Sequence, residues 1–562
     1  MIIVYHVAMY IRQISRINKD GTRIRYLQLA QKYRDEVTGR PKDRVLCHLG
    51  REDHIDQDQI QRLILSLNRF LDADHQLVIQ HGAERLNWDF QLESSVSMGG
   101  SYVLDSVWQE LGIGETLRNL LAARSFGSDV ERHLFAMVCN RALDPRSKLS
   151  LERWVGRKEW IEGLPEVSVH NLYRAMDFLV AHHEEIQRSV FFSVATLLNL
   201  EVDLLFFDTT STYFEIEDED EDGLRRYGRS KDKRDDAPQV VIGLAVTRDG
   251  IPVRCWVLEG NSSDAGLVDR IQSDMAGWRL NRVVWVVDRG FAGSSQRVAF
   301  QRGGGHVIVG EKLRHTAKEN HEALSRRGKY AKVREDLEVK EVKVTRGSQV
   351  RRFFVMRNPC EAVRDARKRK RAIHRLEVEI KRLNDGRRRR GEGHSKAVCA
   401  LKSHPSLGRF IRELKDGQLR IDRAAIRDDA KLDGKYMVSC TDPSLSAEDV
   451  ALGYKQLWQV ERAFRTLKTT LDLRPIYHRK DDRIRAHVIL CWMALLLVRV
   501  IENRVGQSWT LIRDELDLIH RAKIFNKDGS ILLTTNLTKD QENILNALQV
   551  RAPKRIHDVQ SA

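Results

Sequence analysis

Cysteine is scarce in this 562-residue sequence, and no two cysteines form a CxxC pair. The seven that are present are scattered between Cys47 and Cys491. A disulfide framework or a zinc ribbon needs cysteines at short, regular spacings. The sequence therefore argues against both classes of protein and favours a reducing compartment.

Long hydrophobic runs are also lacking. The longest, VILCWMALLLV at residues 488–498, is shorter than the roughly 18 residues of a membrane-spanning helix, so it predicts a buried helix. The opening MIIVYHVAMYIR has neither the basic start nor the small-residue cleavage site of a signal peptide. We therefore expect a cytoplasmic protein without a membrane partner.

Charged residues are plentiful, and one sign is in excess. The chain has 95 Lys and Arg against 79 Asp and Glu, a formal net charge of +16. A surplus of this size indicates a polyanionic partner such as nucleic acid; the alternative is that the charge only keeps the protein soluble. Half of the surplus lies in residues 361–390, which hold 13 basic and 5 acidic residues.

A chain of this length is too long for one hydrophobic core, so we expect several domains. The spacing of apolar residues also changes several times along the chain. Strands are predicted at 25–34 and 43–50, and helical spacing dominates the next 140 residues. Buried strands, a hairpin that turns at Asp249-Gly250 and amphipathic helices then indicate an α/β fold. We predict these parts: 9–55, a small N-terminal module; 56–200, a helical region that could bind DNA ends; 201–310 and 441–505, an α/β core; 311–440, an insertion containing strands; 506–562, a C-terminal region.

Two predicted strands of the core end on a carboxylate. VDLLFFD runs into Asp208, and NRVVWVVD runs into Asp288. Functional groups collect where the strands of an α/β sheet end, although an Asp at such a place can also simply begin a turn. Two carboxylates that meet repel each other unless a cation lies between them. Carboxylate oxygens suit Mg²⁺ or Mn²⁺, and zinc is not expected because neither strand end carries His or Cys.

A third carboxylate is predicted on a long helix that begins with a capping box at Ser446 and Asp449. On a helical wheel, Tyr454 and Lys468 lie within about 20° of Glu461, beside the apolar stripe. Glu461 can therefore face the strand ends while the helix packs on the sheet. The alternative is an ordinary surface ion pair with Arg465, one turn further on.

These residues resemble DDE transposases of bacterial insertion sequences, in the insertion-sequence-four superfamily. That superfamily has a Tyr, Arg, Glu and Lys signature around its third acid, which here reads Tyr454, Leu457, Glu461 and Lys468. The segments FFDTTS, LEGNSSD, VVDRGF and LDLRPIYHRKDDRIRAHV are also similar to the family. The resemblance extends from Met9 to about residue 500.

The resemblance implies an RNase H-like catalytic core interrupted by the insertion, with Asp208, Asp288 and Glu461 as catalytic residues that bind two Mg²⁺ or Mn²⁺ ions. It also implies cut-and-paste transposition, in which double-stranded DNA at the terminal inverted repeats is cut, through a hairpin in the family, and joined to target DNA. Tyr454 and Lys468 would bind DNA phosphate. Leu457 replaces the Arg of the signature, and Arg462 or Arg465 could supply the missing contact.

Because two ends must be held together, we expect a homodimer in the synaptic complex. Two other functions stay open at this point. One is an RNase H-like nuclease that cuts DNA without strand transfer. The other is a non-catalytic DNA-binding protein descended from a transposase.

Overall fold

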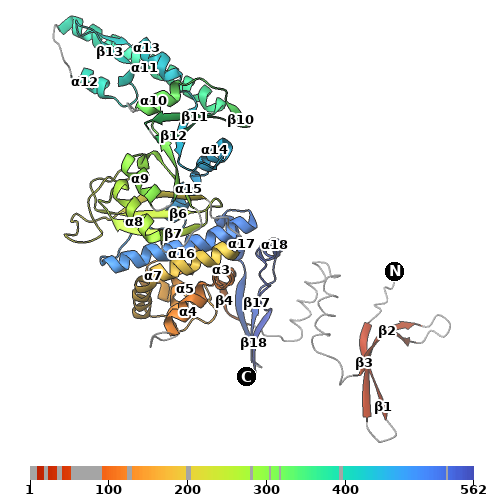
Figure 1. Ribbon diagram of the computed structural model, residues 1–562. Coiled ribbons are helices and arrows are strands. Elements are labelled where there is room, and N and C mark those ends of the chain that lie inside the picture. Colours follow the sequence, from red (N-terminus) through yellow and green to blue (C-terminus); the bar gives the residue numbers. More distant parts are fainter. Residues whose placement is uncertain are drawn as a thin grey trace. The chain divides into compact units, whose positions relative to one another are not determined.

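The computed structural model describes most of the chain, in two compact units. The first unit comprises Met1–Gln91, Ile524–Ser530 and Ser561–Ala562, and the second comprises Leu92–Lys523 and Ile531–Gln560. Figure 1 shows the elements of both units. The described residues are 9–17, 23–34, 41–51, 91–122, 129–197, 204–276, 278, 283–302, 305–314, 318–347, 349–390, 396–526 and 529–561.

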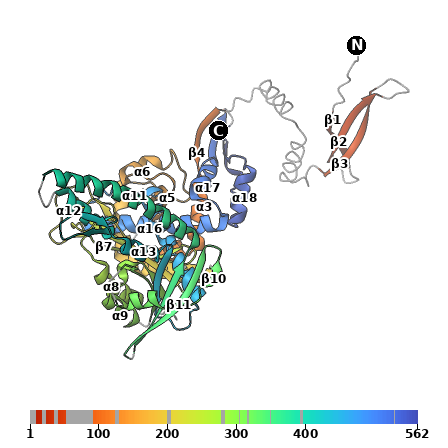
Figure 2. The same cartoon turned by 90° about the horizontal axis from the view of Figure 1, so that it is seen from above.

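The first unit contains a three-stranded antiparallel sheet, which is also labelled in Figure 2. Its strands are β1 (Met9–Ile17), β2 (Arg23–Arg34) and β3 (Pro41–Arg51). The structure confirms the two strands that the sequence predicted, β2 and β3, and adds β1, which pairs with β2 along its whole length. Most of the predicted turn between β2 and β3 lies outside the described residues.

The second unit is built on a nine-stranded mixed sheet in the order β10-β11-β12-β15-β9-β8-β5-β6-β7. Strands β5, β8 and β9 run parallel to one another, and all other neighbours are antiparallel. The predicted β6–β7 hairpin is confirmed, and Gly250 in its turn has the positive φ of 75° that glycine adopts without strain. The strands are β5 (Leu204–Tyr213), β6 (Gln239–Val246), β7 (Pro252–Glu259), β8 (Val284–Val287), β9 (His306–Glu311), β10 (Ala331–Arg334), β11 (Leu337–Arg346), β12 (Gln349–Arg357) and β15 (Lys435–Cys440).

Both faces of this sheet are buried, because alternate side chains of each strand enter different cores. Phe206 of β5 and Val286 of β8 belong to one core, together with helices α15 (Trp458–Thr469) and α16 (Asp481–Val505). Phe207 and Trp285 belong to the other, together with α8 (Asp264–Ala276) and α9 (Ser294–Arg302). Strands covered on both faces read as continuous apolar runs, which is how β5 and β8 appear in the sequence.

The helix α16 contains the apolar run at 488–498 and is the central helix of the second unit. It packs on β7 at one side and on helices α5 and α7 at the other (Figure 1). It is long and apolar enough to span a membrane, but 94% of its most apolar window is buried inside the protein. The prediction that residues 488–498 form a buried helix is confirmed. The helices that precede the sheet in the chain are α3 (Gly99–Glu110), α4 (Ile113–Ala122), α5 (Asp129–Leu143), α6 (Lys148–Trp154) and α7 (Val169–Leu197).

The insertion predicted at 311–440 begins with strands that extend the central sheet. The prediction that this region contains strands is confirmed, for example by LEVKEVKV in β11, QVRRFFVMR in β12 and KYMVSC in β15. The basic segment 361–390 lies within one long helix, α11 (Pro359–Arg390), which packs with a hairpin on a small core of its own. The remaining elements of this region are α10 (Lys318–Ser325), α12 (Lys396–Ser403), η3 (Gly408–Phe410), β13 (Ile411–Glu413), β14 (Leu419–Ile421) and α13 (Arg423–Ala430).

A four-stranded sheet of order β18-β17-β16-β4 joins the C-terminal region to the segment before α3. Helix α18 begins with a capping box at Thr538 and Gln541, which satisfies two backbone N–H groups. The elements here are β4 (Gln91–Ser97), α17 (Trp509–Leu516), β16 (His520–Asn526), β17 (Gly529–Thr534), α18 (Lys539–Ala547) and β18 (Ile556–Ser561).

Candidate active site

Asp208 on β5 and Asp288, the residue that follows β8, lie side by side at the point where these two parallel strands cease to pair. Phe207 of β5 is in register with Val287 of β8, and each Asp is the next residue of its chain. Strand alternation places both carboxylates on the sheet face of Phe206 and Val286. Helix α15 packs on that same face.

The prediction that β5 ends at Asp208 is wrong. The strand continues to Tyr213, and Asp208 pairs with Leu244 of β6 in the middle of it. What stops at Asp208 is the pairing with β8, whose last paired residue is Val287. The hydroxyl-bearing residues 209–212 stay in the sheet because their side chains are buried and pair with the apolar strand β6.

Asp208 already has a cation beside it. Lys231 Nζ lies 3.4 Å from Asp208 Oδ1 and donates to Thr209 Oγ1 at 2.6 Å. The Thr209 backbone N–H donates to Asp208 Oδ1 at 2.7 Å. Burial raises the pKa of Asp208, Asp288 raises it further, and Lys231 opposes the shift. The carboxylate is therefore buried, close to a second carboxylate and in contact with one cation.

Asp288 follows β8 with extended backbone and begins the 3₁₀ turn η2 (Arg289–Phe291). The Tyr454 hydroxyl approaches Asp288 Oδ1 at 3.5 Å, and burial raises the pKa of Tyr454. Gly310 on β9 makes this approach possible, because a side chain there would collide with the Tyr454 hydroxyl. Tyr454 thus lies beside the second carboxylate, and its predicted contact with a DNA phosphate stays a prediction.

The single long helix predicted to carry Tyr454, Glu461 and Lys468 is two helices. The capping box at Ser446 and Asp449 is confirmed, but α14 (Ala447–Lys455) ends before the turn at Gln456. Backbone bonds across that turn are of the tighter i to i−3 kind, so the chain rotates further per residue than in an α-helix. The prediction that Glu461 and Lys468 lie on the same side of one helix therefore holds, because both are on α15. It does not hold for Tyr454, which is on α14.

Glu461 is exposed in the first turn of α15, whose buried residues Val460, Ala463 and Phe464 face the sheet. No ion pair joins it to Arg465 in the described part of the chain. Among the described residues, no three His, Cys, Asp or Glu side chains lie together closely enough to hold a metal ion. The structure therefore pairs Asp208 with Asp288 and leaves Glu461 on the neighbouring helix.

The two Asp side chains fit a hard divalent cation. They supply carboxylate oxygens from adjacent strands, on a face where an ammonium group already contacts one of them. Oxygen donors of this kind suit Mg²⁺ or Mn²⁺. Glu461 would add a further carboxylate, so the donor set is consistent with the predicted metal.

Lys468 is partly buried and held by a carboxylate. Its Nζ lies 2.9 Å from Asp232 Oδ1, and Arg474 Nη1 lies 2.8 Å from Asp232 Oδ2. Burial lowers the pKa of Lys468, and Asp232 opposes the shift. Lys468 and Arg474 thus share the carboxylate of Asp232. Asp232 follows Lys231 in the chain, and Lys231 contacts Asp208.

The two remaining arginines of the predicted DNA site differ in their surroundings. Arg462 binds Glu502 of α16 at 3.1 Å and lies over the Trp458 ring. Arg465 is exposed on α15. Of the two, Arg465 is the one whose side chain is more accessible to a phosphate.

Lys231, Asp232 and Arg474 were not predicted from the sequence. The first two lie in the stretch 215–236, whose many charges predict a solvated loop, and most of its acidic part, residues 215–222, is exposed. The one sequence feature that could have drawn attention to Lys231 is that Gly228 and Ser230 interrupt the run of charged residues just before it. Glycine and serine are common in any loop, so this signal does not identify a site.

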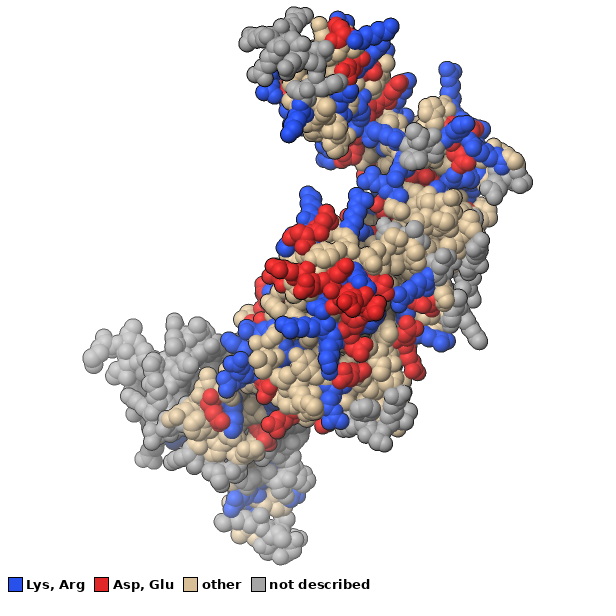
Figure 3. All heavy atoms as spheres, turned by 90° about the vertical axis from the view of Figure 1, so that its left-hand side faces the viewer, with Lys and Arg blue, Asp and Glu red and all other residues tan. Residues whose placement is uncertain are grey.

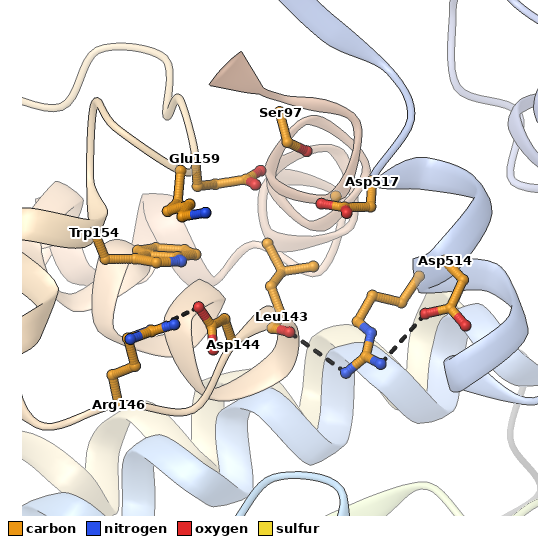
Figure 4. A pocket seen from close by; sticks show the side chains of 11 residues that line it. Ser97, Leu143, Asp144, Arg146, Trp154, Glu159, Asp514 and Asp517 are labelled. Carbon is orange, nitrogen blue, oxygen red and sulfur yellow. Dashed lines mark hydrogen bonds and ion pairs between the residues drawn. The ribbon is translucent and has the colours of Figure 1, made fainter. Parts of the chain in front are cut away.

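A separate polar cavity of about 400 Å³ lies between α3, α5, α6 and α17, away from Asp208. Figure 4 shows Glu159 and Trp154 at one side of it and Asp514 and Asp517 at the other. Arg513, which also lines the cavity, lies 3.3 Å from Asp514. Glu159 is buried and accepts a hydrogen bond from the Ser101 backbone N–H at 3.0 Å. Burial raises its pKa to about 7.

The raised pKa of Glu159 predicts a pH dependence of stability. The folded protein keeps this proton up to about pH 7, whereas the unfolded chain releases it near 4.5. The stabilisation that protonated Glu159 gives the folded protein is therefore fully present below pH 4.5. As the pH rises from 4.5 to about 7, the free energy of unfolding falls by at most about 1.4 kcal/mol per pH unit. In urea unfolding at pH 5 and pH 8, Glu159→Gln should lack this loss. An identical pH dependence in the variant would contradict the assignment.

Comparison with known proteins gives two family matches. Residues 11–78 match the N-terminal domain of the IS1634 family transposases, and residues 211–497 match the transposase DDE domain. Among curated proteins, none matches the chain. The solved structures include a piggyBac transposase synaptic complex with hairpin DNA, which is 9% identical with a TM-score of 0.32 and covers 70% of this chain and 71% of its own.

Proposed function

This chain belongs to the DDE transposases, and from that premise we propose that it cleaves and joins DNA at the ends of an insertion sequence by cut-and-paste transposition. The observation that carries the proposal is the proximity of Asp208 and Asp288, which directly follow the paired residues Phe207 and Val287 of two parallel strands. Asp288 lies within the matched DDE domain, and Asp208 lies three residues before its start. Glu461, on the helix that packs on the same sheet face, is the proposed third acid.

An RNase H-like core is part of the proposal. Three antiparallel strands, β5 to β7, are followed by β8 and β9, which add on the other side of β5 in parallel. The first acid lies on the first of these strands and the second directly after the fourth. This order supports the core at 201–310 and 441–505, with 311–440 as its insertion.

Asp208, Asp288 and Glu461 would hold two Mg²⁺ or Mn²⁺ ions, which when bound activate water and neutralise charge at phosphorus. Because the three carboxylates do not form one cluster among the described residues, the proposal requires Glu461 to approach the two Asp side chains on DNA. Tyr454 would hold a DNA phosphate by its hydroxyl beside Asp288. Lys468, and Arg465 on the exposed side of α15, would hold others by charge.

Each chemical step is an in-line displacement at phosphorus. In cleavage, a water oxygen forms a bond to phosphorus, the bond to the 3′ oxygen breaks, and that oxygen takes a proton to leave as a 3′-OH. In joining, this 3′-OH attacks a target phosphodiester, loses its proton and displaces the target 3′ oxygen. One phosphodiester is exchanged for another, so joining needs no further co-reactant. A homodimer that holds two ends together is part of the same proposal.

The two alternative functions differ in their products. Wild-type protein, Mg²⁺ and a duplex from the DNA that flanks its gene should give nicked strands on a denaturing gel. A non-catalytic DNA-binding protein gives none, whatever the metal. A nuclease gives nicks and never joins the new 3′ end to a second duplex, so only joined strands identify a transposase.

The contacts of Lys468 predict opposite effects for two substitutions on DNA binding. Lys468→Ala should weaken binding of the end duplex and lower the slope of log K against log salt by about 0.9, the value of one lost phosphate contact. Asp232→Asn should strengthen binding, because it removes the carboxylate that neutralises Lys468 and Arg474. Both are measured by salt titration in Ca²⁺, which we expect to support binding without efficient cutting.

Glu461→Gln is the control for this experiment, since a metal ligand neutralises no phosphate itself and should leave the slope nearly unchanged. If Lys468→Ala binds DNA with the affinity and salt slope of the wild type, Lys468 does not bind phosphate and serves only to pair with Asp232. Weaker binding in Asp232→Asn would give that carboxylate a structural role instead.

A further inference from the structure

One face of helix α11 carries only positive charge along five exposed residues. At about 100° per residue, Arg364, Lys368, Arg371, Arg375 and Arg382 fall within a sector of about 60°. We call these five residues the basic stripe. It is about 27 Å long, from a rise of about 1.5 Å per residue, and belongs to the lobe from which Lys and Arg project in Figure 3.

The opposite side of α11 is fixed to its own lobe. Leu376 and Ile380 pack in a small core with Phe410 and Leu419. The Asn384 side chain donates to the Leu419 carbonyl at 2.9 Å and accepts from the Leu419 N–H at 3.0 Å. The stripe is therefore held outward on a helix that cannot rotate without breaking these contacts.

Few acids offset the stripe. Glu361 pairs with Arg364 and Glu379 with Arg382, each from the flank of the sector and near one end of it. Such exposed pairs contribute little free energy and are readily exchanged. The three central cations project between these pairs, and they are Lys368, Arg371 and Arg375.

We propose that the basic stripe binds the phosphate backbone of duplex DNA without reading its sequence. The inference rests on the proposed function, because it takes DNA as the substrate. A straight row of about 27 Å spans about eight base pairs at about 3.4 Å each, which suits a rigid duplex. No Asn or Gln, the side chains that read adenine in the major groove, accompanies the cations in the sector. Arg and Lys can also bind guanine, so a scrambled duplex in the test below separates phosphate binding from reading of the sequence.

The stripe is tested in the full chain with Lys368→Ala, Arg371→Ala and Arg375→Ala combined. Alanine is the best helix former, so α11 should persist. Two duplexes of about 30 base pairs serve as probes, one from the DNA that flanks the gene and one scrambled. Affinity for both should fall at least tenfold, and the slope of log K against log salt should fall by about 2 to 3. A variant that keeps the charge, with Lys368→Arg, Arg371→Lys and Arg375→Lys, should bind as wild type does.

The matched control removes three charges from the same lobe. Arg412 and Arg420 face each other across β13 and β14, on the side opposite to Leu419, and Lys415 is exposed in the turn between them. The control variant Arg412→Ala, Lys415→Ala and Arg420→Ala should change affinity and slope by much less. Equal losses in both triple variants would overturn the inference, as would wild-type binding by the stripe variant.

The proposed function and the inference fail in different ways. If wild type cuts and joins DNA while the stripe variant binds both duplexes normally, only the inference is wrong. If the stripe variant loses affinity for duplex RNA and none for duplex DNA, the stripe has a different partner and the inference is again wrong. If wild type binds no duplex DNA at all, both are wrong.

Discussion

Asp208→Asn, Asp288→Asn and Glu461→Gln should each reduce DNA cleavage by about 10²- to 10³-fold, the usual cost of removing one electrostatic stabiliser of a transition state. Each substitution removes a charge and almost no volume, so the fold should persist. Asp208 lies on β5 beside Asp288, which directly follows the parallel strand β8, and Glu461 lies on a helix that packs on the same sheet face. Binding of the end duplex should stay near the wild-type level, measured in Ca²⁺.

The control for these variants is Glu448→Gln, the same chemical change at an exposed position of the neighbouring helix α14. It should cleave as wild type does. Because the three acids act as a unit, a double variant should lose little more than a single one. Efficient Mg²⁺-dependent cleavage by any one of the three single variants would remove that residue from the site.

Glu502→Ala should lower the free energy of unfolding by about 3 to 5 kcal/mol, the usual cost of breaking a buried ion pair by removing one partner. Glu502 lies 2.7 Å from Arg499, whose side chain is only 1% exposed. It also binds Arg462 of α15 at 3.1 Å and accepts from the Trp509 N–H at 2.9 Å. Its loss leaves a buried guanidinium unpaired and loosens the helix that carries Glu461.

The matched control for Glu502 lies on the same helix. Arg504 pairs with Glu110 at 2.6 Å, with exposed fractions of 21% and 37%. Arg504→Ala should cost about 1 kcal/mol or less, as is usual for an exposed pair. Urea unfolding curves of the two variants give both values. If Glu502→Ala costs no more than Arg504→Ala, the Arg499 pair does not contribute as the structure indicates.

Much of the fold could be predicted because its signals are local. Continuous apolar runs identified β5 and β8, since both faces of these strands are buried. The dipeptide Asp249-Gly250 identified a hairpin, and Ser446 with Asp449 identified a helix start. Each of these features depends on residues only a few positions apart.

Other features depend on distant partners and could not be predicted. The continuation of β5 beyond Asp208 depends on pairing with β6, about 30 residues later. The break between α14 and α15 falls at Gln456 and Leu457, where no Gly or Pro stands, and Gly453 three residues earlier lies inside α14. The contacts of Lys231 with Asp208 and of Asp232 with Lys468 join residues up to 236 positions apart, which spacing within one helix or strand cannot reveal.

The most direct test of the central claim is a joining assay with the full chain. A labelled duplex from the end of the element is incubated with wild-type protein, Mg²⁺ and an unlabelled second duplex, and the products are separated on a denaturing gel. The account predicts labelled strands longer than the starting strand, formed when the new 3′-OH attacks the second duplex, and their absence with Asp288→Asn. Labelled strands that are only shortened, or joined strands that form equally well with Asp288→Asn, would contradict it.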